Sequence, residues 1–206
     1  MTAIQEVETV NQVESLALPR RVLVAEDELL LARMLGELLG SLDIEVIGPA
    51  SNGRAAIELA RTHLPDLAVL DIRMPEVDGL AAAEVLHREL QVPVVMLTAY
   101  SDDSFVQQSC EAGVCGYLLK PVTLDELRVG LTVAWRQHLT RRALAEQVGQ
   151  LEQKLRDRKV IERAKGVLMK REGMDEEAAM RQLQRLARDA RRPMVALAQE
   201  LLNAAG

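Results

Sequence analysis

Carboxylates, a hydroxyl and an ammonium group follow four short apolar runs in the first 121 residues. They are Glu26 and Asp27 after 21–25, Asp71 at the end of 67–71, Thr98 after 94–97, and Lys120 after 116–119. A buried strand ending in a carboxylate is unfavourable unless that group acts at the strand's carboxyl end, where open α/β sheets place their sites. These residue types predict metal-assisted phosphoryl transfer with Asp71 as the acceptor.

The predicted chemistry needs a divalent cation, because a carboxylate attacks a phosphorylated donor poorly until the charge on the transferring group is neutralised. Mg²⁺ suits the site because it prefers oxygen ligands. The expected ligands are two carboxylates, a third carboxylate acting through water, and a backbone carbonyl: Asp27, Asp71, Glu26 and Arg73, respectively. We expect the Lys120 ammonium to pair with the phosphoryl oxygens and the Thr98 hydroxyl to donate a hydrogen bond to one of them.

These groups meet only if the apolar runs are neighbouring strands of one sheet. Strand-like segments at 21–26, 44–48, 67–71, 93–97 and 115–119 alternate with helix-like segments at about 28–40, 53–63, 78–90 and 103–111, and another helix begins near Thr123. Fully apolar strands predict a parallel sheet covered on both faces. We therefore expect an α/β doubly wound domain with five parallel strands over residues 20–135, preceded by a mobile tail over residues 1–19.

The helical pattern that begins at Thr123 continues far past the predicted sheet. Apolar residues recur at the four-three-four spacing of a heptad seam, at Leu144, Val148, Leu151 and Leu155. This predicts a helical linker or coiled-coil stalk over residues 136–156 that could join two copies of the chain. A helix packed within its own chain fits the short seam almost as well.

Three short helices are expected after the stalk, as a small all-α module over residues 157–206. The first covers about 157–172 and is stopped by Gly173, the second begins at Asp175, and the third opens at Pro193. Because a module of about 50 residues builds only a small core, we expect it to dock on the stalk or on a second copy.

Charge is distributed unevenly along the chain. Residues 1–135 hold 9 Lys and Arg against 21 Asp and Glu, whereas residues 136–206 hold 16 against 10. The asymmetry suggests an acidic module joined to one that meets a polyanion, although a solvated helical face is the plainer alternative. The chain has neither an apolar run of membrane-spanning length nor the features of a signal peptide, so we expect a soluble, cytoplasmic protein without a membrane partner.

The acceptor residues fall in a known pattern. Glu26 with Asp27, Asp71, Met74 with Pro75, Gly79, Thr98 with Ala99, and Lys120 with Pro121 lie where the flavodoxin-like receiver domain of two-component response regulators has its motifs, and residues 20–135 resemble that domain. The resemblance implies Mg²⁺-dependent transfer from a phosphohistidine of a sensor histidine kinase to Asp71, with slow self-dephosphorylation and no other enzymatic activity. It also implies a switch pair, Thr98 and Tyr117, and a cis peptide before Pro121.

The run from Arg158 to Met169 resembles the signature of the ANTAR domain, the RNA-binding module of transcription antitermination regulators, and the resemblance extends over about 144–203. Pro193 and Met194 depart from the pattern. The implied function is dimeric binding of stem-loop RNA in a leader transcript, which prevents a terminator hairpin. The expected RNA contacts are Arg158, Lys159, Arg163, Lys165 and Gly166.

Other functions remain open from the residues alone. The output module could bind DNA as a helix-turn-helix with residues 172–174 as the turn, or it could bind a protein without the salt dependence of phosphate contacts. A haloacid-type phosphatase is disfavoured, because it would need a second acid two residues after Asp71, where Arg73 stands.

Overall fold

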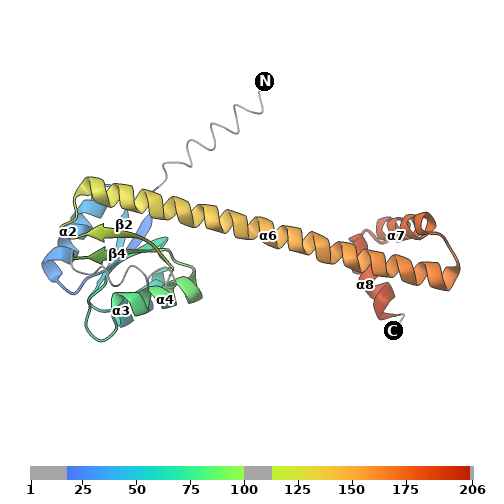
Figure 1. Ribbon diagram of the computed structural model, residues 1–206, viewed down its shortest axis with the longest axis horizontal. Helices are drawn as coiled ribbons and strands as arrows, with labels where there is room; N and C mark the ends of the chain where they lie inside the picture. The colour runs from blue at the N-terminus through green and yellow to red at the C-terminus, as the bar shows by residue number, and fades with distance from the viewer. Residues whose placement is uncertain (1–17, 100–112, 205–206) are drawn as a thin grey trace, which may run out of the picture. The chain divides into compact units, whose positions relative to one another are not determined.

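The computed structural model describes residues 18–99 and 113–204 (Figure 1). The chain divides into two compact units, with the division between Arg141 and Arg142. Among the described residues, no helix combines the length and the apolar character needed to cross a membrane.

A five-stranded parallel sheet forms the centre of the first unit. Its strands are β1 (Arg21–Ala25), β2 (Glu45–Ala50), β3 (Leu67–Asp71), β4 (Val94–Thr98) and β5 (Val114–Leu119). They lie in the order β2-β1-β3-β4-β5, and every neighbouring pair is parallel. This confirms the doubly wound fold and places β1 and β3, which carry the acidic residues, side by side.

Helices cover both faces of the sheet, as the apolar strands require. On one face, α2 (Leu29–Gly40) and the beginning of α6 (Leu124–Glu172) pack on Val22, Val24 and Val69. On the other, α3 (Gly53–His63) and α4 (Gly79–Leu90) pack mainly through alanines. The helix expected over 103–111 and most of the expected N-terminal tail lie outside the described residues.

One long helix replaces two expected elements. The separate helix expected over about 157–172 is wrong, because α6 runs without a break from Leu124 to Glu172. No proline interrupts this stretch, and pairs one turn apart such as Arg142–Glu146 and Glu152–Arg156 support it. The four heptad residues, Leu144, Val148, Leu151 and Leu155, are each 54–60% exposed.

The second unit is a small helical module. The last turns of α6 pack against α7 (Glu176–Ala190) and α8 (Met194–Asn203). Gly173, with φ +67°, lies in the turn before α7, and the Asp175 side chain accepts a hydrogen bond from the Ala178 amide at 2.7 Å. Six partly buried apolar side chains pack against a core of five buried residues: Ala164, Leu168, Ala179, Leu183 and Ala198.

Candidate functional site

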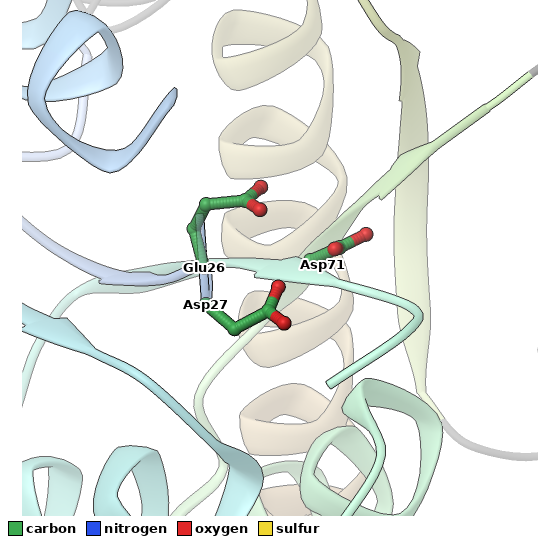
Figure 2. Close-up of side chains that lie close together, drawn as sticks. All are labelled: Glu26, Asp27 and Asp71. Carbon is green, nitrogen blue, oxygen red and sulfur yellow. The ribbon is translucent and has the colours of Figure 1, made fainter. Parts of the chain in front are cut away.

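Three carboxylates meet at the carboxyl edge of the sheet. Glu26 and Asp27 directly follow β1, and Asp71 is the last residue of the neighbouring strand β3. One carboxylate oxygen from each lies within 4.8 Å of the other two, and Figure 2 shows the three side chains close together. Parallel strands in register bring these residues together because Ala25 pairs with Leu70, one residue before each acid.

The Lys120 ammonium group completes the cluster from the end of β5. Its Nζ atom lies 2.7 Å from Glu26 Oε2 and 2.9 Å from Asp71 Oδ2. Burial works against the charged ammonium, but hydrogen bonds to Glu26 and Asp71 outweigh it and raise the pKa of Lys120. Lys120 is therefore held as a cation beside the predicted acceptor oxygen.

One ammonium does not balance three carboxylates. Glu26 is buried, and Asp71 is only 7% exposed. Burial, assisted by the nearby Asp71 charge, raises the pKa of Glu26 despite the bond from Lys120. Because the donor set is all oxygen and carries excess negative charge, the residues fit a divalent hard cation such as Mg²⁺. Asp27, Asp71 and Glu26 would hold the ion; the carbonyl of Arg73 as a further ligand remains a prediction.

Magnesium is expected to stabilise the first unit against heat. A ligand that binds only the folded state at about 100 times its dissociation constant contributes about 2.7 kcal/mol. We expect Mg²⁺ to raise the melting temperature of the unchanged chain in calorimetry, and Asp27→Asn to remove most of that rise because it removes a charged ligand. Glu37→Gln, which changes an exposed carboxylate on α2 outside the cluster, is the control and should keep the full rise. Equal rises in all three proteins would contradict a magnesium site at these residues.

The expected switch residues lie on β4 and β5. Thr98 ends β4, and its hydroxyl donates a hydrogen bond to the Ala99 carbonyl at 3.0 Å. The Tyr117 hydroxyl is buried and has no hydrogen-bond partner among the residues that the structure describes. An unpaired buried hydroxyl is unfavourable by about 1–3 kcal/mol. The switch role of Thr98 and Tyr117 stays a prediction. The Lys120–Pro121 peptide is cis, as the family resemblance implied.

The five expected RNA-binding residues differ in their surroundings. Arg158, Lys159 and Arg163 are exposed on α6, and none of the three forms an ion pair within the described part of the chain. Gly166 has open space around it, since a Cβ placed there would have no atom within 4 Å. Helix packing therefore does not explain this glycine. Lys165 differs from the others because it is buried.

Lys165 is also paired with two carboxylates. Its Nζ atom lies 2.8 Å from Glu162 Oε2 on α6 and 2.7 Å from Glu176 Oε1 on α7. Glu176 is an acid in the first turn of α7, directly after the N-cap Asp175. In one continuous helix, residues 165 and 176 would lie about 16 Å apart along the axis. The turn at Gly173, between α6 and α7, brings them together.

Two family models match the chain. The response regulator receiver domain matches residues 22–132, and the ANTAR domain matches residues 149–202. The chain is 39% identical over 190 residues to the transcriptional regulatory protein PdtaR of Mycobacterium tuberculosis, and the match covers 92% of this chain and 93% of that protein.

Solved receiver domains share the fold of the first unit. The signal receiver domain of a modulated diguanylate cyclase from Desulfovibrio desulfuricans is 32% identical, with a TM-score of 0.56. The match covers 61% of this chain and 99% of the diguanylate cyclase domain. The receiver domain of the sensor histidine kinase PA1611 from Pseudomonas aeruginosa is 27% identical, with a TM-score of 0.51, and was solved with a magnesium ion coordinated in its active-site cleft. The match covers 56% of this chain and 97% of the PA1611 domain. The chain therefore belongs to the response regulators with a receiver domain followed by an ANTAR domain, and it is a phosphorylation-controlled transcription regulator with an RNA-binding output.

Proposed function

We propose that Asp71 accepts a phosphoryl group from a sensor histidine kinase and that the C-terminal module then binds stem-loop RNA in leader transcripts as a homodimer, preventing transcription termination. The observation that carries the proposal is the cluster of Glu26, Asp27, Asp71 and Lys120 at one sheet edge, in a chain whose C-terminal part matches an RNA-binding family.

The proposed transfer forms a bond from a carboxylate oxygen of Asp71 to phosphorus and breaks the bond from phosphorus to the donor's imidazole nitrogen. A bound Mg²⁺ supplies charge neutralisation to the transferring phosphoryl group. Lys120, already 2.9 Å from Asp71 Oδ2, places its ammonium where the new phosphoryl oxygens gain negative charge. Glu26 holds the other side of that ammonium at 2.7 Å and so orients it. The Thr98 hydroxyl at the end of β4 is proposed to bond a phosphoryl oxygen and, with Tyr117, to report phosphorylation.

The RNA contacts proposed on α6 are to the phosphate backbone. No Phe, Tyr or Trp follows Trp135, and residues 139–206 contain no His, so the C-terminal module has no aromatic ring on which bases could stack. The exposed guanidinium and ammonium groups of Arg158, Lys159 and Arg163 suit phosphate oxygens instead. The open surface at Gly166 allows a nucleic-acid backbone to approach the helix closely.

The homodimer is proposed to form along α6. Leu144, Val148, Leu151 and Leu155 follow a heptad spacing and are 54–60% exposed in the single chain. Exposed apolar residues at this spacing are buried when two helices pair. Two copies would bring two modules to one transcript and raise the overall affinity through their linkage.

Replacing Lys159 and Arg163 together by glutamine is expected to weaken binding of a leader stem-loop. Each lost phosphate contact removes about 0.7 to 0.9 from the slope of log affinity against log salt concentration, so the slope should fall by about 1.5. Fluorescence anisotropy across a salt series measures both affinity and slope.

Arg156→Gln is the matched control for this double variant. Arg156 is exposed on the same helix but already pairs with Glu152, so its loss should change the slope less. If the salt slope of the double variant equals that of the unchanged chain, Lys159 and Arg163 do not contact RNA phosphates. Much tighter binding of duplex DNA than of any hairpin would instead favour a DNA-binding output.

A further inference from the structure

Lys165 connects two helices of the C-terminal module. Its side chain is 9% exposed, and its ammonium bonds Glu162 on α6 and Glu176 in the first turn of α7. Glu162 lies on the same helix as Lys165, so of the two bonds that Lys165 makes, the one to Glu176 connects α6 with α7. A second polar contact also crosses, because Gln182 Nε2 on α7 donates to Glu172 of α6 at 3.1 Å.

This environment is a poor one for a group that reaches out to a phosphate. An ammonium has three N–H donors, and two of those on Lys165 already point at carboxylates. The hydrogen bonds that the ammonium donates to Glu162 and to Glu176 raise the pKa of Lys165, so it remains charged and paired at neutral pH. Contact with RNA would break both bonds and bring two carboxylates close to the phosphate backbone. Lys159 and Arg163, in contrast, are exposed and would break no ion pair with the described residues.

The position of α7 matters because that helix carries its own cations. Arg185 and Arg188 lie on α7, are exposed, and form no ion pair within residues 113–204. The core beneath these helices is small: five residues are buried, three of them alanines, and six partly buried apolar side chains pack against them. Such a small core defines the rotation and sliding of α7 along α6 only weakly. The ion pair between Lys165 and Glu176 therefore contributes strongly to the position of α7.

We propose that Lys165 is a positioning residue, which holds α7 against α6 through Glu176 so that the cations of both helices meet the same RNA. This inference rests on the proposed function, since it assigns a role within the RNA-binding module. It changes the role expected for Lys165 from a contact with RNA to a bond within the protein, and it gives Glu176 a part in RNA binding although a carboxylate repels phosphate.

The two roles of Lys165 predict opposite effects of Glu176→Gln in the full-length chain. If Lys165 positions α7, the substitution replaces an ion pair with a weaker hydrogen bond to a neutral amide oxygen, which loosens the helix pair and weakens binding of a leader stem-loop. The apparent dissociation constant rises by the inverse of the competent fraction, so a fraction of about one tenth gives about a tenfold loss. If Lys165 contacts RNA, the same substitution weakens one of the two bonds that hold the ammonium and removes a negative charge, so affinity stays equal or rises.

The fold should survive this test, because Glu162 still pairs with the buried ammonium in Glu176→Gln. Circular dichroism should therefore show unchanged helix content. The matched control is Glu177→Gln, which removes the neighbouring acid of the same turn, whose partner is the exposed Arg181. We expect the control to bind RNA as well as the unchanged chain or slightly better, as loss of a negative charge predicts.

Lys165→Met supplies a second measurement. A positioning role predicts weaker binding with the salt slope unchanged, whereas a lost phosphate contact lowers the slope by about 1. Equal or tighter binding by Glu176→Gln, or a lowered slope in Lys165→Met, would overturn the positioning role alone. Failure of the unchanged chain to bind any stem-loop RNA would overturn the proposed function, and the positioning role with it.

Discussion

Asp71→Asn is expected to take up no phosphoryl group from a sensor kinase or from a small donor such as acetyl phosphate. The amide of asparagine lacks the anionic oxygen that attacks phosphorus, and it removes a charged ligand from the acidic cluster. The other groups of the site remain, because Lys120 keeps its 2.7 Å pair with Glu26. Intact-mass spectrometry in the presence of Mg²⁺ measures the aspartyl phosphate directly.

Asp66→Asn provides the control on the same strand. Asp66 lies just before β3, at the end opposite Asp71, where its Oδ2 accepts hydrogen bonds from the amides of Arg20 and Arg21 at 2.9 Å. An asparagine oxygen can still accept these bonds, so we expect phosphorylation close to that of the unchanged chain. Phosphate found on another residue of Asp71→Asn would show that the acceptor is misassigned.

Asp71→Asn also tests whether phosphorylation controls RNA binding. In cells, RNA crosslinked to the unchanged chain and to Asp71→Asn should differ in the recovered leader transcripts if phosphate controls the output. Equal recovery of the same leaders would show that RNA binding is independent of Asp71. That result would leave the acceptor chemistry intact and remove the proposed control.

The acidic cluster of Glu26, Asp27 and Asp71 was predictable because the geometry of parallel strands determines it. Each of its residues ends or follows an apolar run, and parallel strands bring such positions to one edge. Glu26, Asp27 and Asp71 are therefore related by a simple rule, and the structure brings their oxygens within 4.8 Å of one another. Assignment of the family added the identity of the reaction, which residue types alone leave broader.

The helical module was less predictable, because exposure and pairing do not follow from a helical period. Lys159, Arg163 and Lys165 look alike as basic residues, yet Lys165 alone of the three is buried. Its partner Glu176 lies beyond the Gly173 turn, and the direction of that turn depends on packing of the small core. The missing helix boundary near residue 157 has a similar cause, since a run without proline or a stop signal lets α6 continue.

Gly79→Ala is expected to destabilise the receiver domain by several kcal/mol. Gly79 is the first residue of α4, and its amide donates a hydrogen bond to the Ile72 carbonyl at 3.0 Å. A Cβ at Gly79 would lie 1.9 Å from the backbone oxygen of Asp71 and 2.8 Å from its carbonyl carbon. These are backbone atoms of a fully buried strand, so no side-chain rotation relieves the overlap. Overpacking in rigid surroundings destabilises by about 1–3 kcal/mol, and displacement of a backbone hydrogen bond adds to this.

Chemical denaturation of the full-length chain, followed by circular dichroism, measures the loss, and Gly36→Ala is the matched control. Gly36 lies within α2 of the same domain, and no atom lies within 4 Å of a Cβ placed there. An alanine at that position should stabilise the helix by up to about 1 kcal/mol. Opposite signs at two helical glycines would show that contact with Asp71, and not helix propensity, requires Gly79. Because the atom it would strike is the carbonyl oxygen of Asp71, the proposed acceptor, the folded fraction of Gly79→Ala should also accept phosphate more slowly. Normal stability with normal phosphorylation would mean that the loop between β3 and α4 can move away from Asp71 without altering the site.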